Sequence, residues 1–447
     1  MYSRFIAPVA RNITFKTFGL VVFLAILAKL AGFGKEIAIA ARFGVSPKID
    51  GYLFALNFLT TPTTIWLAAA SAIFIPQFVE RTSSNPEDSR QLRKEFFLIS
   101  LIAGFVVGGM FAALLYIYIA TGLSGLSAKS QGHALVAVLW LWPVIPLLFV
   151  AYSGAVCLMA RNIQINTFYD ALPAIFILAA LVYLPIELKT LLIATTVGFA
   201  AQAIATVVSL WHANELELPS RVVRKHSWSL LFPALMAMLG IQTLQSGVAL
   251  VDLLLAAHLP TGSVSRFGYA LRMQAVFLTI LTLAVQRVLL PALSSIQRQD
   301  RHRNATFIRN WALLLTVFST IIAAVGMIAS EDIIRLARKR GSFSGEDTVV
   351  VADLFAILIW QLPFYVLSVL YSQFQIVEKN YRLLAIIAVI ALVTKAFLGI
   401  LFIELLGLRG LAASVVAVSA IQLGILIYGT RNLRQRGPNP LGKAKDL

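Results

Sequence analysis

Residues 96–120 read FFLISLIAGFVVGGMFAALLYIYIA, a run without a single charged side chain. A helix rises about 1.5 Å per residue, so this run is long enough to cross the roughly 30 Å hydrocarbon core of a bilayer. Similar runs recur along the chain of 447 residues, of which 59% are apolar and 13% are charged. A soluble globule could not bury that much apolar surface, which excludes a cytosolic enzyme, a secreted scaffold and a disordered chain.

We predict twelve membrane-spanning helices, joined by segments too short to hold a soluble domain. Their ranges are 17–41, 51–79, 96–120, 134–158, 167–186, 190–211, 229–257, 267–295, 308–330, 351–377, 383–403 and 410–430. The longest connecting segment, 331–350, interleaves apolar and charged residues, which predicts a short helix lying in the membrane interface.

The positive charge of the chain predicts its orientation. The chain has 37 Lys and Arg against 20 Asp and Glu, a net charge of +17. Basic residues collect in cytoplasmic loops. With the N-terminus inside, the cytoplasmic segments carry 22 Lys and Arg and the opposite segments carry 10. We therefore expect both termini in the cytoplasm and no nucleic-acid partner.

The two halves of the sequence repeat each other weakly. Glu36–Ala41 matches Asp252–Ala257, and Phe54–Asn57 matches Tyr269–Arg272 at almost the same offset. The shared order and nearly constant offset indicate an internal repeat. Because each half has an even number of spans, the halves face the same way, which is typical of a transporter architecture.

The predicted fold is therefore an all-α polytopic membrane protein with two six-helix lobes. The N-terminal lobe spans 1–212 and the C-terminal lobe spans 229–432. A cytoplasmic linker at 213–228 joins them, and a basic cytoplasmic tail follows at 433–447.

Charged residues within the spans are the candidate binding residues. A charge at the centre of a spanning helix costs roughly 2.5–3.5 kcal/mol on insertion scales, so it usually faces a cavity or a partner. Lys29 and Lys35 in the first span and Arg272 in the eighth predict a cationic central cavity. Ammonium and guanidinium groups suit an anionic headgroup such as a diphosphate. Alternatively, these cations pair with nearby acids or extend to the interface.

State-dependent ion pairs would bias such a transporter between its inward-open and outward-open forms. The acidic residues predicted to form these pairs with the cavity cations are Glu36, Asp50 and Asp252. Arg42 and Arg266 are further candidates for gating ion pairs. For Arg287, Lys395 and Asp353 we expect structural pairing, because we place them nearer the span ends.

Threonines surround a proline in the second span. Thr63 and Thr64 follow Pro62, which removes a helical hydrogen bond. Their hydroxyls either bond to nearby backbone carbonyls or contact a substrate.

The sequence offers no enzyme motif. It contains no G-x-x-x-x-G-K-[ST] and no G-x-S-x-G, and Cys157 is the single cysteine. We expect no cofactor and no metal. The driving force is expected to be an ion gradient, the membrane potential or removal of the product.

Several motifs resemble the MurJ (MviN) lipid II flippase family. The run Lys29–Glu36, then Ala41–Gly44 and Asp50, resembles the family pattern R-x-x-G-F-x-R-[DE], A-R-x-F-G and an Asp that opens the second helix. Further similar segments are Pro260–Ser265, Tyr269–Arg272, Leu290–Ser294 and Arg340–Ser344 with Asp347. The resemblance implies the fold of the multidrug/oligosaccharidyl-lipid/polysaccharide (MOP) exporters, with a central cavity that opens alternately to each side.

Some positions depart from the family pattern. Thr63 and Thr64 stand where the family has an arginine pair, and Lys29 and Lys35 replace two cavity arginines. The resemblance implies a flippase of the bacterial inner membrane for a polyprenyl-diphosphate-linked saccharide, either lipid II or an exopolysaccharide precursor. Its partners would be this substrate, membrane lipids and glycan-assembly proteins. The alternatives are a drug or cation antiporter of the same superfamily and a non-transporting scaffold of a glycan-assembly complex.

Overall fold

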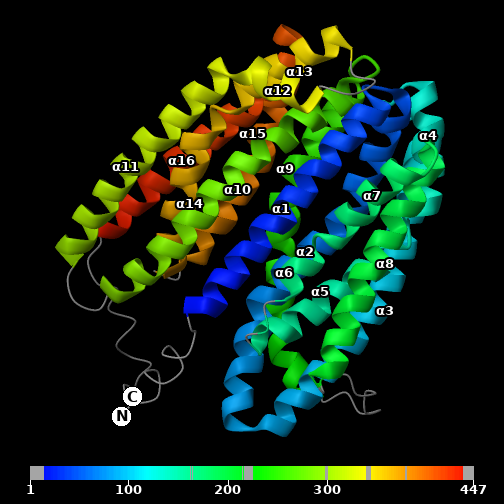
Figure 1. The fold of residues 1–447 in the computed structure, drawn as a ribbon. Coiled ribbons are helices and arrows are strands. Elements are labelled where there is room, and N and C mark those ends of the chain that lie inside the picture. The colour runs from blue at the N-terminus through cyan, green and yellow to red at the C-terminus, as the bar shows by residue number, and fades with distance from the viewer. Residues whose placement is uncertain are drawn as a thin grey trace. The chain divides into compact units, whose positions relative to one another are not determined.

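The computed structural model of the protein consists of helices (Figure 1). It describes residues 15–161, 163, 165–213, 215, 225–296, 301–338, 344–377 and 380–435, and within these ranges there is no strand. The all-α class expected from the apolar runs is confirmed.

The chain divides into two compact units between Thr243 and Leu244, inside helix α9. The helices of the first unit are α1 (Phe15–Phe43), α2 (Pro47–Ser84), α3 (Pro86–Ala120), α4 (Ala128–Leu141), α5 (Val144–Ala160), α6 (Asn166–Tyr169), α7 (Leu172–Tyr183), α8 (Leu188–His212) and the first part of α9 (Lys225–Ala257). The second unit contains the rest of α9 and α10 (Ser263–Ile296), α11 (Arg301–Ile328), α12 (Ser330–Arg338), α13 (Gly345–Leu358), α14 (Gln361–Val377), α15 (Tyr381–Leu406) and α16 (Leu408–Gln435).

Each predicted span coincides with a helix or a pair of helices. In the described part of the chain, eight helices are long and apolar enough to cross a bilayer, or nine if the bent pair α4 and α5 forms one span. The other three predicted spans fall on α1, on α10 and on α6 with α7. Of these, α7 is apolar but has only 12 residues.

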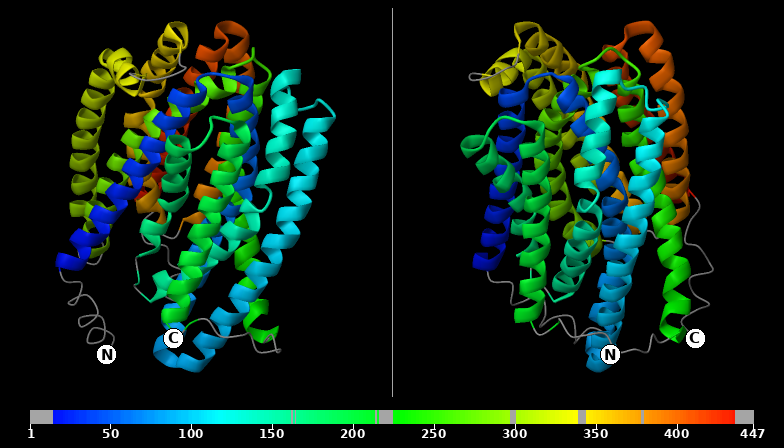
Figure 2. Two further views of the ribbon diagram at one scale, coloured as in Figure 1. Left: turned by 45° about the vertical axis from the view of Figure 1, so that its right-hand side comes forward. Right: turned by 90° about the vertical axis from the view of Figure 1, so that its right-hand side faces the viewer.

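The first unit is built around α2, which packs against α3, α4 and α5, while α8 packs against α5 and α7. Helices α2 and α3 form a long hairpin that both views of Figure 2 show. Its turn is fixed by Asn85, whose side chain accepts a hydrogen bond from the backbone N–H of Asp88, and by Pro86 at the start of α3. The segment 80–95 between two predicted spans is therefore almost entirely helical.

The second unit is centred on α14 and α16. Helix α16 packs against α13, α14 and α15, and α14 also packs against α10 and α11. The short helix expected between 331 and 350 is present as α12, which packs against α13. Its placement in a membrane interface stays a prediction.

Both units break their fourth span. Helices α4 and α5 meet at an angle of 48° at Trp142 and Pro143, because proline has no N–H to continue the helical ladder. Helices α13 and α14 break at Ile359 and Trp360. The separation of Pro143 from Trp360 along the chain agrees with the offset of the internal repeat, so the two breaks occupy corresponding positions.

The predicted lobe boundaries stay a prediction. Of the linker 213–228, the structure describes residues 213, 215 and 225–228, and the tail 433–447 lies outside the described residues after Gln435. The division inside α9 makes this helix part of both units.

Candidate functional site

Lys35 and Glu36 form an ion pair on α1. Lys35 Nζ lies 2.8 Å from Glu36 Oε1, and the two side chains are 20% and 11% exposed. The pairing of a cavity cation with a neighbouring acid was the alternative to a free cationic site, and in this conformation it applies to Lys35. Lys29 lies nearer the N-terminal end of α1, but its side chain lies outside the described residues.

Two further candidates stand at helix ends. Arg42 is exposed in the last turn of α1, and Asp50 is buried in the first turn of α2. A cation at the C-terminal end and an anion at the N-terminal end of a helix both stabilise it through the helix dipole. These positions explain why both residue types are favourable there, while their role in gating stays a prediction.

The threonines near Pro62 bond to their own helix. Thr63 donates to the carbonyl of Thr60 at 2.6 Å and Thr64 donates to that of Thr61 at 2.9 Å. Thr63 is fully buried, whereas Thr64 is exposed. Of the two threonines expected to contact substrate, only Thr64 presents its side chain at a surface of the unit.

In the second unit, Arg266 forms an ion pair with Asp347. The Arg266 Nε and Nη2 atoms donate to Asp347 Oδ1 at 2.9 and 2.7 Å. Ser344 caps α13 by accepting from the backbone N–H of Asp347 at 3.0 Å and donates to Asp347 Oδ2 at 2.6 Å. The carboxylate thus links the first turn of α10 to the first turn of α13.

Asp252 pairs with Lys395. The carboxylate on α9 forms an ion pair with the Lys395 ammonium on α15, which also donates to Ser414 Oγ on α16 at 2.6 Å. Lys395 is fully buried and lies in the middle of α15, so our placement of it near a span end was wrong. Arg272, expected as a partner of these acids, lies on α10 and is half-buried.

Asp353 has the structural role expected of it, because it pairs with Arg409 at an exposed position. The side chain of Arg287 lies outside the described residues.

Sequence reasoning missed a buried charge cluster in the first unit. Arg93 Nε donates to Glu215 Oε2 at 2.6 Å, Arg161 pairs with the same carboxylate, and Arg93 Nη1 donates to Ser89 Oγ at 2.6 Å. Glu215 was counted as part of a solvated linker, yet its side chain is only 2% exposed. An acidic residue between spans that are flanked by arginines was the available signal.

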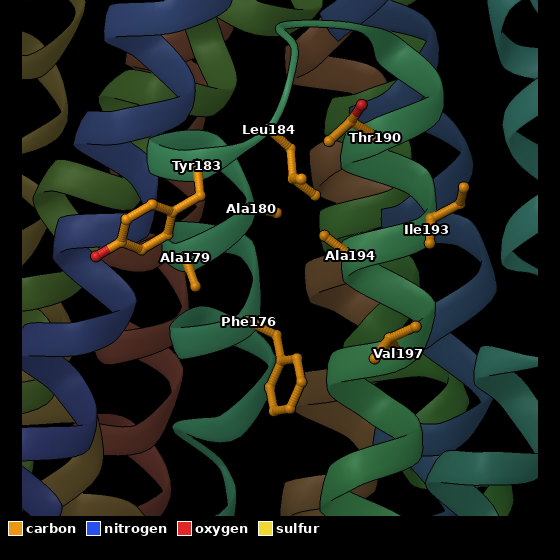
Figure 3. A pocket seen from close by; sticks show the side chains of 9 residues that line it. All are labelled: Phe176, Ala179, Ala180, Tyr183, Leu184, Thr190, Ile193, Ala194 and Val197. Atoms are coloured by element: carbon orange, nitrogen blue, oxygen red, sulfur yellow. The ribbon is translucent and has the colours of Figure 1, made fainter.

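A groove of about 450 Å³ opens between α7 and α8 (Figure 3). Its lining is apolar, with Phe176, Tyr183, Ile193 and Val197 among its nine residues, and none of the nine is charged. The groove therefore suits hydrocarbon and cannot be the predicted cationic site.

No group of three or more His, Cys, Asp or Glu side chains that could hold a metal ion occurs in the part of the chain that the structure describes. Cys157 is buried in α5 as a free thiol.

Comparison with known proteins gives a consistent result. The family model described as lipid II flippase MurJ matches residues 39–441. A probable lipid II flippase MurJ of Aquifex aeolicus is 24% identical over 424 residues, covering 93% of this chain and 83% of that protein. A probable lipid II flippase MurJ of Rhizobium tropici is 26% identical over 437 residues, covering 90% and 78%.

Solved structures share the fold. A lipid II flippase MurJ in an inward closed conformation superposes with a TM-score of 0.74 at 20% identity, covering 92% of this chain and 87% of that one. An inward-facing multidrug resistance transporter of the MATE family, in the MOP superfamily, also gives 0.74 at 14% identity, covering 92% and 96%. The MOP exporter fold expected from the motifs is confirmed.

Proposed function

Because the chain belongs to the lipid II flippase MurJ family, we propose that it moves a polyprenyl-diphosphate-linked saccharide across the membrane by alternating access. The family match over residues 39–441 is the observation that carries this proposal. Family membership makes the chain a multi-pass transporter of the bacterial inner membrane and confirms that it is not an enzyme. The cytoplasmic location of both termini stays a prediction.

The substrate class follows from the relatives and from the basic side chains. The relatives from Aquifex aeolicus and Rhizobium tropici are named as probable lipid II flippases, which makes lipid II the first candidate. Lys29, Lys35 and Arg272 supply the cationic groups that a diphosphate requires. The threonines at 63 and 64 lower the positive charge relative to the family, and this favours an exopolysaccharide precursor as the second candidate.

The Lys35–Glu36 pair supports a switching role. Both side chains are partly exposed, so their ion pair can exchange partners with little cost of desolvation. A diphosphate that reaches Lys35 competes with Glu36 for the ammonium. Binding of substrate would thereby free the Glu36 carboxylate and shift the population of conformers.

Neither candidate requires ATP, since the sequence has no phosphate-binding loop. We propose that a gradient, the membrane potential or consumption of the product outside drives net movement. Glycan-assembly proteins that consume the product are the expected partners.

The experiment is rescue of a bacterium depleted of its own lipid II flippase, with the amount of this protein in the membrane verified. We expect the natural sequence to restore growth. Lys35→Gln should lower flipping of labelled lipid II in proteoliposomes about tenfold, because one charge-assisted contact contributes roughly 1.5–3 kcal/mol. Lys48→Gln, which removes an exposed lysine at the start of α2, is the matched control and should retain the rate.

The outcomes separate the alternatives. Failure to rescue with normal membrane levels would exclude lipid II and leave the exopolysaccharide precursor as the substrate to test. Transport that is lost on neutralising Asp252 but survives Lys29→Gln would favour a cation antiporter. An unchanged phenotype for Lys29→Gln combined with Arg272→Gln would favour a scaffold.

A further inference from the structure

The deepest charge in the second unit lies between spanning helices. Asp252 is on α9, within the candidate span Leu231–Ala257, and Lys395 is at the middle of α15, within the span Arg382–Leu406. The Lys395 side chain is 0% exposed and that of Asp252 is 10% exposed. A carboxylate at this position needs a cation beside it, because an isolated charge in an apolar interior is very unfavourable.

The ammonium has oxygen ligands from two other helices. It forms an ion pair with Asp252 and donates to Ser414 Oγ at 2.6 Å. Ser414 directs its own proton to the carbonyl of Leu411 at 2.7 Å, so a lone pair of the hydroxyl faces the ammonium. A carboxylate oxygen and a hydroxyl oxygen are also the ligand types that a small monovalent cation takes from a protein.

The packing on both sides encloses the pair. Leu392 covers Gly247, and Leu255 covers Gly399, about one turn before and after the ion pair. A Cβ atom on Gly399 would lie 2.5 Å from Leu255 Cδ1. The absence of side chains at the two glycines lets leucines from the facing helix fill the space, which shields the pair from water.

We propose that the Lys395 ammonium is a tethered counter-cation that occupies the place of a mobile monovalent cation at Asp252. The second unit then binds neither sodium nor potassium at this carboxylate, since its charge is already neutralised. The cycle is not coupled to exchange of a cation there. This consequence for coupling rests on the proposed function, whereas the ion-binding statement holds for any substrate.

The test measures cation binding by the full-length protein in nanodiscs. Thermal unfolding is followed in sodium, potassium and N-methylglucamine chloride at equal ionic strength, together with binding of radioactive sodium. The natural sequence should give the same Tm in all three salts and bind no sodium at Asp252. Lys395→Ala should acquire a saturable rise in Tm of at least about 2 °C in sodium or potassium.

The controls locate the acquired response. The double variant Lys395→Ala with Asp252→Asn should lose it, and Lys189→Ala should never show it, since Lys189 lies over the ring of Trp140 in the first unit. If Lys395→Ala fails to fold, Lys395→Ser replaces it, and the measurement on the natural sequence needs no variant.

Two results would overturn the proposal. One is saturable sodium or potassium binding by the natural sequence that Asp252→Asn abolishes. The other is a folded Lys395→Ala or Lys395→Ser protein whose Tm responds to neither cation. Absence of flipping by the natural sequence in any salt would instead count against the proposed function, because the binding assay does not depend on it.

Discussion

The two units bury charge in different places. In the first unit, Arg93, Glu215 and Arg161 meet where helices end, and the Arg161 side chain is 44% exposed. In the second unit, Asp252 and Lys395 meet between helices, and the Lys395 side chain is fully buried. The comparison teaches that two buried carboxylates can differ in their access to water, and hence in the cost of losing a partner.

The largest effect is expected from Lys395→Met. The variant keeps a long side chain of similar volume but leaves Asp252 without its ammonium partner. Breaking a buried ion pair from one side typically destabilises by about 3–5 kcal/mol. Unfolding followed by tryptophan fluorescence in nanodiscs should show a larger fall in Tm than any of the single substitutions below.

The matched control is Lys395→Met combined with Asp252→Asn. Removal of both charges should recover most of the lost stability, because no uncompensated carboxylate remains. A double variant as unstable as the single one would show that the shape of the lysine, and not its charge, stabilises the second unit.

A smaller effect is expected from Glu215→Gln in the first unit. The substitution keeps the shape of the side chain but removes the charge shared by Arg93 and Arg161, at a cost of about 2 kcal/mol. Arg161→Gln should cost less than about 1 kcal/mol, since its side chain is 44% exposed. Equal shifts in Tm for the two variants would contradict the assignment of Arg93 as the main partner.

The smallest effect is expected from Arg409→Gln. Arg409 pairs with Asp353 at a position where the two side chains are 65% and 39% exposed. Exposed ion pairs are screened by water and salt, so the stability should change by no more than about 0.5 kcal/mol. A fall in Tm comparable to that of Glu215→Gln would mean that exposure does not rank these pairs.

Hydropathy and charge were sufficient to predict the helices and the family. Each apolar run coincides with a helix or a pair of helices, because a bilayer demands about 20 apolar residues in succession. The break between α4 and α5 was less visible, although Pro143 marks it. The hairpin of α2 and α3 was also longer than predicted, since its end is polar and hydropathy stops at the membrane boundary.

The pairing of charges could not be predicted from the sequence. Asp252 and Lys395 lie far apart along the chain, and only the packing of α9 against α15 brings them together. Arg93 and Glu215 are likewise distant in sequence and meet only in the folded first unit. Neighbouring pairs such as Lys35 with Glu36 were accessible because adjacent residues on a helix need no tertiary structure to meet.

The burial of Cys157 has a practical consequence for spectroscopy. It is the chain's only cysteine and it is 3% exposed, so thiol reagents should leave it unmodified in the folded protein. Cysteines introduced at exposed positions such as Leu123 in the first unit and Leu405 in the second could therefore carry spin labels without altering the native background. Distance distributions between such labels would give the number of conformers and their populations directly, with and without a lipid-linked saccharide.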